Sequence, residues 1–392
     1  MNFQLSPEQE LLVESTRRLA REHFANGAYT REGVAWDSLR VLAKAGLTGL
    51  TIPESDGGHG ATVLDAVLVM EAVSQVCPQS GDAVQATNFG AIRQLSKFGS
   101  AELKTAVLPQ LLNGDGFMSV GMSEPDAGSA LTDLRTTARY EGDQVVLSGE
   151  KAWNSNGPEI THVVVWCRFG PEVGDIGAVV VEADAPGFSR GPAQRYMSGD
   201  YYSSLHFDEC RVPRSHVLLD HDGLATMMPS FGLERLGNST RALALAQSAF
   251  DMAVEHAKSR TQFGRPLCEF QGLQWRFADM RVKLEAARLL VYRAACNAGV
   301  GDPDPVEVAI AKAYTNDVAF EVANEALQVF GAAGYSTEMP LEYLVRRIRG
   351  WMIAGGSMEM MRNRIAQAVF GRHFSQRRPR SGYAADHGGA EG

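Results

Sequence analysis

Residues 144–155 read QVVLSGEKAWNS, a short run of valines and polar residues that ends near a tryptophan. Three further short stretches, the first two with three consecutive valines, are likewise separated by Gly, Pro, Asp or Asn: THVVVWCRFG (161–170), GAVVVEAD (177–184) and SSLHFDECRVP (203–213). Short runs of β-branched residues between turn formers are typical of β-strands. We therefore predict that residues 117–222 form a small β domain.

The sequence on both sides of this region has the periodicity of helices. In VLDAVLVMEAVSQV (63–76) apolar residues recur at threes and fours, which predicts an N-terminal helical domain over 1–116. A similar stripe, which predicts helices over 223–375, consists of Leu243, Ala246, Phe250, Ala253 and Ala257. The polar, Gly-rich tail at 376–392 is predicted to be disordered. Helices, then strands, then helices favour an α+β protein of three consecutive units over an α/β fold with a parallel sheet.

The composition argues against several classes of partner. The 392 residues carry a net charge of −9, so a general affinity for nucleic acid or anionic membranes is not expected. The sequence has no run of about 18 apolar residues, so no membrane span is predicted. The N-terminus lacks the basic and apolar regions of a signal peptide. The five cysteines are scattered, which is typical of reduced thiols, and we expect a cytoplasmic protein.

Several common catalytic and binding motifs are absent from the sequence. There is no GxGxxG after a predicted strand, no GxxxxGK[ST], no HExxH and no GxSxG. The nine histidines show no spacing typical of metal ligands, so no metal site is predicted. His206, which lies within a predicted strand, is interpreted as structural.

Two motifs lie in the first half of the predicted β domain. In GMSEPDAGS (121–129) the small residues would let the backbone pass close to a flat ligand, although an ordinary Gly-rich connector has the same composition. In GEKAWNSNG (149–157), Trp153 stands beside hydroxyl and amide side chains. Such a tryptophan either belongs to the core or stacks against an aromatic ring.

Two more motifs lie in the C-terminal helical region. SRTQFGRPLCEFQ (259–271) places Arg260 and Arg265 around a glycine turn, which suits a pyrophosphate or a solvated face. QVFGAAGYSTEMP (328–340) is a loop of small residues at a helix end, where backbone amides suit an anion.

Each motif is weak alone, but in this order and spacing they resemble the acyl-CoA dehydrogenase family, over about residues 4–372. The resemblance implies a helical N-terminal domain, a central β-barrel-like domain and a C-terminal four-helix bundle. It also implies bound FAD, a homotetramer built as a dimer of dimers, and α,β-dehydrogenation of an acyl thioester. An electron-transfer flavoprotein is the implied partner that reoxidises the flavin.

The first two motifs are similar to those that line the flavin in this family. The resemblance assigns flavin contacts to Met122, Ser123, Gly128, Ser129, Trp153 and Ser155. Among these, Ser129 would also line the substrate, Trp153 would lie against the flavin, and the Ser155 hydroxyl would lie near flavin N5. Ala130 stands where the family usually has aspartate.

The later motifs resemble segments that contact other parts of FAD. The resemblance assigns contacts with the neighbouring subunit's FAD to Arg260, Phe263 and Gln271. It assigns contacts with the adenosine-diphosphate portion to Gln328 and Gly331. Contacts with the adenosine are assigned to Ser357 and Glu359.

Residues 351–360, WMIAGGSMEM, place Gly355 where many members of the family have the catalytic glutamate. In those members the carboxylate removes a proton from Cα of the thioester while hydride leaves Cβ for flavin N5. A glycine cannot remove the proton, but its backbone N–H still suits the thioester oxygen, in the manner of an oxyanion hole. Substrate contacts are also expected for Ala354 and Gly356.

The segment FGLERLGNSTRA (231–242) resembles isovaleryl-type and long-chain-type members, which place the base on an adjacent helix in a stretch reading like LERL. Glu234 occupies that position, and Arg235 beside it is expected to contact the substrate. The alternative is that Glu234 is a solvated helix carboxylate. Its apolar neighbours, and the missing carboxylate at Gly355, favour the catalytic role.

The sequence leaves more than one substrate and more than one chemistry open. The family usually has an Arg-Gly-Ser-x-Thr-like run in the loop at 194–213, where this chain has Ser198, Asp200, Tyr201 and Tyr202. An acyl group on a carrier protein would suit the same site as acyl-CoA. FAD-dependent dehydrogenation is the leading hypothesis, and the alternatives are oxidase-like or desulfinase-like chemistry on the same fold, or a catalytically silent member of the family.

Overall fold

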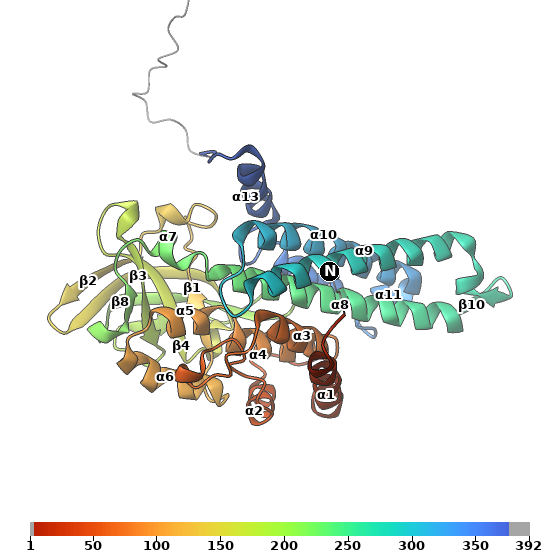
Figure 1. Ribbon diagram of the computed structural model, residues 1–392, viewed down its shortest axis with the longest axis horizontal. Helices are drawn as coiled ribbons and strands as arrows, with labels where there is room; N and C mark the ends of the chain where they lie inside the picture. The colour runs from red at the N-terminus through yellow and green to blue at the C-terminus, as the bar shows by residue number, and fades with distance from the viewer. Residues whose placement is uncertain (1–3, 376–392) are drawn as a thin grey trace, which may run out of the picture.

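The computed structural model describes residues 4–375, and Figure 1 shows helices at both ends of the chain with a sheet between them. The N-terminal helices are α1 (Pro7–His23), α2 (Trp36–Lys44), α3 (Val63–Ser74), α4 (Pro78–Asn88), α5 (Ala91–Phe98) and α6 (Ala101–Leu112). The C-terminal helices are α7 (Gly223–Met227), α8 (Phe231–Ser259), α9 (Gln271–Ala298), α10 (Pro305–Phe330), α11 (Ala332–Tyr335), α12 (Leu341–Trp351) and α13 (Met358–Phe370). This order confirms the predicted fold class. The predicted disordered tail, 376–392, lies outside the described residues.

Local sequence signals begin two of the N-terminal helices. Ser6 and Gln9 form a capping box at α1, and Thr62 with Asp65 forms another at α3. These side chains satisfy backbone N–H groups that the first turn leaves unpaired. Helix α3 is buried along nearly its whole length because it packs against α1, α4, α8 and α9. It therefore joins the N-terminal helices to the C-terminal ones.

Between the two groups of helices in the sequence, the chain forms a nine-stranded sheet, which lies at one end of the molecule (Figure 1). Its strands are β1 (Met118–Gly121), β2 (Thr137–Glu141), β3 (Gln144–Ser155), β4 (His162–Arg168), β5 (Ile176–Glu182), β6 (Phe188–Arg190), β7 (Gln194–Arg195), β8 (Tyr201–Pro213) and β9 (Val217–Leu219). Most neighbours pair antiparallel in the order β6-β8-β3-β2-β4-β5-β9, whereas β1 pairs parallel with β4 and β7 pairs with β8. The four stretches that the sequence predicts to be strands form β3, β4, β5 and most of β8.

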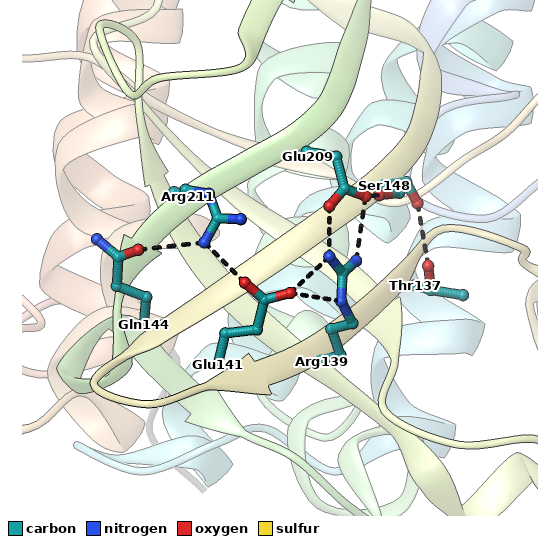
Figure 2. A network of polar contacts seen from close by, with 7 residues as sticks. All are labelled: Thr137, Arg139, Glu141, Gln144, Ser148, Glu209 and Arg211. Carbon is teal, nitrogen blue, oxygen red and sulfur yellow. Dashed lines mark hydrogen bonds and ion pairs between the residues drawn. The ribbon is translucent and has the colours of Figure 1, made fainter.

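Charged side chains join the exposed faces of β2, β3 and β8 (Figure 2). Arg139 donates to Glu141 and to Glu209, and Ser148 donates to Glu209 at 2.8 Å. Arg211 donates to Glu141 at 2.9 Å. Because these side chains are exposed, solvent screens the ion pairs and each contributes little to stability. The network belongs to the outer surface of the sheet.

The long helices α8, α9 and α10 run side by side, and α12 and α13 pack on α10 (Figure 1). The predicted stripe on α8, from Leu243 to Ala257, is buried in this bundle. After α8 the chain forms a hairpin of β10 (Thr261–Gln262) and β11 (Arg265–Pro266), which projects from the bundle at the end away from the sheet. Among the described residues, no helix is long and apolar enough to cross a membrane, and no cluster of side chains suits a metal ion.

Candidate active site

Glu234 lies in the first turn of α8, and its carboxylate contacts the N-terminal helices. Its Oε2 accepts a hydrogen bond of 2.6 Å from Gln85 Nε2 on α4. A Cβ at Gly237 would lie 1.9 Å from Gln85 Oε1, so this glycine makes room for the amide. A Cβ at Gly90 would lie 2.5 Å from Glu234 Oε2. Glu234 is half-buried and held in one place, unlike a freely solvated helix carboxylate.

Gly355 lies in the loop between α12 and α13, and the structure requires a glycine there. Its φ of +71° is left-handed, a conformation that is unfavourable for residues with a Cβ. A Cβ would also lie 2.6 Å from Asn238 Nδ2 and 3.4 Å from Lys312 Nζ. Side chains of α8 and α10 therefore already fill the space that a side chain at this position would need.

We predict that Gly355→Glu will not restore a base at this position. Left-handed strain and the contact with Asn238 together lower the free energy of unfolding by about 2–4 kcal/mol, so the melting temperature falls. Thermal unfolding measures the change. Gly350→Glu is the matched control, because Gly350 is exposed and a Cβ there meets nothing within 4 Å. A Gly355→Glu protein that keeps its melting temperature and is active without Glu234 would contradict this assignment.

Two cations hold the backbone carbonyls of the same loop. Lys312 Nζ, which is buried, donates to Ala354 O. Arg235 Nε donates to Gly355 O at 2.9 Å. Burial and, less strongly, the charge of Arg235 lower the pKa of Lys312 to about 7, whereas the charge of Glu234 raises it. Arg235 and Asn238, which lie one and four residues after Glu234 on α8, both contact this loop, so the first turns of α8 lie beside the Ala354–Gly355 peptide.

A buried network connects the loop before β8 to α8. Asp82 accepts hydrogen bonds from Arg241 and Arg347, and Arg347 also donates to Asp200. Burial opposes the charge on Arg347, but Asp200 and Asp82 keep its pKa well above the usual value. Arg241 donates in turn to Asn238 Oδ1, and the other amide atom, Nδ2, lies against the α12–α13 loop. The loop that departs from the family pattern is therefore tied to the site by ion pairs.

The loop after β1 is anchored by a buried ion pair that sequence reasoning missed. Lys151 Nζ on β3 donates to Glu124 Oε1 at 2.7 Å and to Met122 O at 3.3 Å, and both charged side chains are buried. The available signal was an acidic residue in one motif and a lysine in the next, but their pairing depends on a contact between distant segments. The predicted flavin contacts of this loop are Met122 and Ser123, which are half-buried, and Gly128 and Ser129, which are exposed.

Trp153 presents an aromatic surface near the end of β3. Its φ of +58° coincides with an irregular pairing of β3 with β8, and the residue is 59% exposed, which excludes a place in the core. The Tyr202 ring lies 5.2 Å from the indole and stacks on the Tyr196 ring at 4.3 Å. Tyr196 also donates to Trp153 O at 2.8 Å. The two tyrosines therefore pack against Trp153, and Ser155 lies exposed at the strand end.

The other predicted FAD contacts lie elsewhere in the chain. Those at the hairpin end of the bundle, all exposed, are Arg260, Phe263, Gln271, Gln328 and Gly331. The His256 ring stacks on Phe330 at 4.1 Å, which brings the end of α10 beside the end of α8. Figure 1 shows this end of the bundle away from the sheet that carries Trp153, so one chain does not bring the two sets together. Ser357 and Glu359 lie at the start of α13, half-buried and exposed respectively.

Protein-family comparison gives three matches that together span most of the chain. Residues 6–115 match the acyl-CoA dehydrogenase N-terminal domain, residues 119–210 match the middle domain, and residues 221–370 match the C-terminal domain.

Individual proteins are similar over nearly the whole chain. A 3-sulfinopropanoyl-CoA desulfinase of Paraburkholderia xenovorans (strain LB400) is 39% identical over 388 residues, which cover 96% of this chain and 99% of that protein. Butyryl-CoA dehydrogenase from Megasphaera elsdenii has a TM-score of 0.89 at 30% identity, over 94% of this chain and 100% of that chain. An FAD complex of PigA has a TM-score of 0.88 at 25% identity, over 94% and 99% of the two chains. This chain therefore belongs to the acyl-CoA dehydrogenase family.

Proposed function

We propose that this protein is an FAD-dependent dehydrogenase that converts an acyl-CoA thioester to the trans-2-enoyl thioester, with Glu234 as the base. The observation that carries the proposal is the Glu234 carboxylate, which Gln85 holds in the part of α8 whose Arg235 and Asn238 contact the α12–α13 loop. Lys312 Nζ lies 3.4 Å from the place of a Cβ at Gly355, where the usual base is missing. A carboxylate from α8 thus replaces one from the α12–α13 loop.

The cofactor is FAD, and the residues present fit it. The exposed indole of Trp153 offers a flat surface for stacking. A Cβ at Gly128 would meet nothing within 4 Å, so the loop after β1 faces open space at this residue. Phe263, which is 94% exposed, and Arg260 would hold the same cofactor from a second subunit. When bound, FAD accepts the hydride that leaves Cβ of the acyl chain.

Residues of this chain carry out the proton transfer. Glu234 takes the proton from Cα, which is the work of a general base within reach of the substrate. The negative charge that develops on the thioester oxygen is held by the backbone N–H of Gly355, a donor that needs no side chain. The proposed substrate contacts are Ser129, Arg235, Ala354 and Gly356.

The proposal includes a second copy of the chain and an electron acceptor. Strand β3, which carries Trp153, and the β10–β11 hairpin, which carries Phe263, lie at different ends of the chain (Figure 1), so a complete FAD site would need two subunits. We propose the homotetramer, built as a dimer of dimers, as the assembly that meets this need. An electron-transfer flavoprotein would reoxidise the flavin, and the reaction would take place in the cytoplasm.

A second candidate is desulfination of an acyl-CoA that carries a sulfinate, which the 39% identity to a desulfinase favours. In that reaction the carbon–sulfur bond breaks, sulfite is released with an oxygen from water, and the carbon takes a proton. Lys312 and Arg235 supply positive charge beside the loop. The Glu234 carboxylate, however, would repel a sulfinate on the acyl chain. The fixed carboxylate therefore favours dehydrogenation of an uncharged acyl chain.

Product analysis distinguishes the two candidates. The FAD-loaded enzyme is incubated with an electron acceptor and with butyryl-, isovaleryl-, octanoyl- or palmitoyl-CoA, and mass spectrometry detects the loss of two hydrogens from the acyl group. 3-Sulfinopropanoyl-CoA is tested in parallel for sulfite. We expect an enoyl-CoA from at least one of the four thioesters. Sulfite without any enoyl product would instead establish the second candidate.

A further inference from the structure

Lys312 is a fully buried lysine on α10 whose ammonium bonds to no carboxylate within residues 4–375. Its Nζ donates to the backbone carbonyl of Ala354. Elsewhere on α10, Glu321 forms an ion pair with Lys283 of α9 at the surface. Burying an ammonium against a neutral carbonyl is unfavourable. This position beside the α12–α13 loop therefore points to a role in that loop.

The direction of the loop's N–H groups follows from these contacts. A trans peptide is planar, with its C=O and N–H pointing to opposite sides, and no peptide bond among the described residues is cis. Because Ala354 O is directed at Lys312, the N–H of Gly355 points away from Lys312. Because Gly355 O accepts from Arg235 Nε at 2.9 Å, the N–H of Gly356 points away from Arg235.

Both N–H groups are available to a ligand. Neither Gly355 nor Gly356 donates its backbone N–H to an acceptor in the described part of the chain. Their φ angles of +71° and +96° are accessible to glycine, so the loop presents two consecutive N–H groups on residues that carry no Cβ. Backbone N–H groups arranged in this way suit an oxygen that gains negative charge.

We propose that Lys312 is a positioning residue that fixes and polarises the Ala354–Gly355 peptide, so that the Gly355 N–H is a stronger donor to the thioester oxygen. The inference rests on the function proposed for this site. A cation on a peptide oxygen draws electron density from the N–H of the same peptide, and hydrogen bonds in series strengthen one another by about 10–30%. The effect is largest when the α-proton moves to Glu234 and the thioester oxygen becomes negative.

The charge of Lys312 gives this arrangement a pH dependence. The charged groups that act on it come from α8: Glu234 favours the ammonium, whereas Arg235 and Arg241 oppose it. The α12–α13 loop faces it with the Ala354 carbonyl. Burial is the largest influence and brings the pKa of Lys312 down to about 7. The ammonium and its polarising effect are therefore present below about pH 7 and are lost as the pH rises through that value.

Acetyl-CoA with a carbon-13 carbonyl tests the proposal without turnover, because its acyl group has no Cβ from which hydride could leave. Isotope-edited infrared spectroscopy reports the carbonyl stretch of the bound thioester, and NMR in deuterium oxide reports exchange of its α-protons. At about pH 6 we expect the Lys312→Met protein to show a higher carbonyl frequency and about 10-fold slower exchange than the wild type. At a pH above the pKa of Lys312, the Lys312→Arg protein should keep the low carbonyl frequency, because a guanidinium stays charged. Lys283→Met, which removes a surface lysine, is the control.

The outcomes separate this inference from the proposed function. Equal frequencies and exchange rates in the wild type and Lys312→Met, with FAD and acetyl-CoA bound to both, overturn the role of Lys312. A carbonyl frequency that is independent of pH in the wild type also overturns it, so the test holds even if Lys312→Met does not fold. A frequency that depends on Lys312, in a protein that oxidises no acyl-CoA, would support the inference and count against dehydrogenation.

Discussion

Replacing Glu234 with glutamine is expected to slow flavin reduction by an acyl-CoA about 100- to 10,000-fold, which is the usual contribution of a general base. Glutamine keeps the shape of the side chain and can still accept the hydrogen bond from Gln85, but it cannot take the α-proton. The affinity for the thioester should change little, because glutamine has the size and shape of glutamate and leaves the other contacts of the bound thioester in place. Anaerobic rapid mixing, followed by the flavin absorbance, measures the rate.

The matched control for this experiment is Glu255→Gln. Glu255 lies on the same helix, is exposed, and pairs with Lys258 at 2.7 Å, so its loss should leave the rate unchanged. If the Glu234→Gln protein reduced its flavin at the wild-type rate, the base would have to be another residue. If the protein is a desulfinase, we expect that Glu234→Gln does not slow its reaction with 3-sulfinopropanoyl-CoA. Removing the negative charge of Glu234 would then ease the approach of a sulfinate, and sulfite release would not fall.

Replacing Asp82 with asparagine is expected to lower the free energy of unfolding by about 3–5 kcal/mol, because it leaves buried cations without their shared carboxylate. The Arg241 and Arg347 side chains are only 7% and 3% exposed, and both bond to Asp82. Arg347 retains its contact with Asp200, which favours the lower end of that range. Denaturant unfolding of the FAD-loaded protein, at one protein concentration, measures the change.

Asp317→Asn is the control for Asp82→Asn, since it makes the same change of charge at the surface. Asp317 pairs with Arg362, and the two side chains are 42% and 56% exposed, so the expected loss is below about 1 kcal/mol. Equal losses in the two variants would show that burial does not set the strength of the Asp82 network. Asp82→Asn should also reduce activity, because Arg241 holds Asn238 against the α12–α13 loop.

The fold could be predicted from the sequence because its signals are local. The four short runs between turn residues became β3, β4, β5 and most of β8, and the apolar stripe of α8 is buried as its period indicated. Whether Trp153 belongs to the core could not be decided in this way. Its exposure depends on an irregularity where β3 meets β8, which is a contact between distant segments.

The candidate site could be predicted only in part. The paired gain at Glu234 and loss at Gly355 pointed to a moved carboxylate, but the bond to Gln85 spans 149 positions in the sequence. Lys312 carried no signal, because a lysine within a helical stretch is usually solvated. Its burial beside Gly355 arises from the packing of α10 against α8 and the α12–α13 loop.

The visible spectrum of the purified protein, recorded during anaerobic titration with acyl-CoA thioesters, tests most directly whether this chain oxidises an acyl-CoA with FAD. We predict that the protein carries FAD and that at least one of butyryl-, isovaleryl-, octanoyl- and palmitoyl-CoA bleaches the flavin band by hydride transfer. The extent of bleaching would also rank the acyl chains. A flavin band that none of the four thioesters bleaches, in a protein that releases sulfite from 3-sulfinopropanoyl-CoA, would contradict the dehydrogenase function.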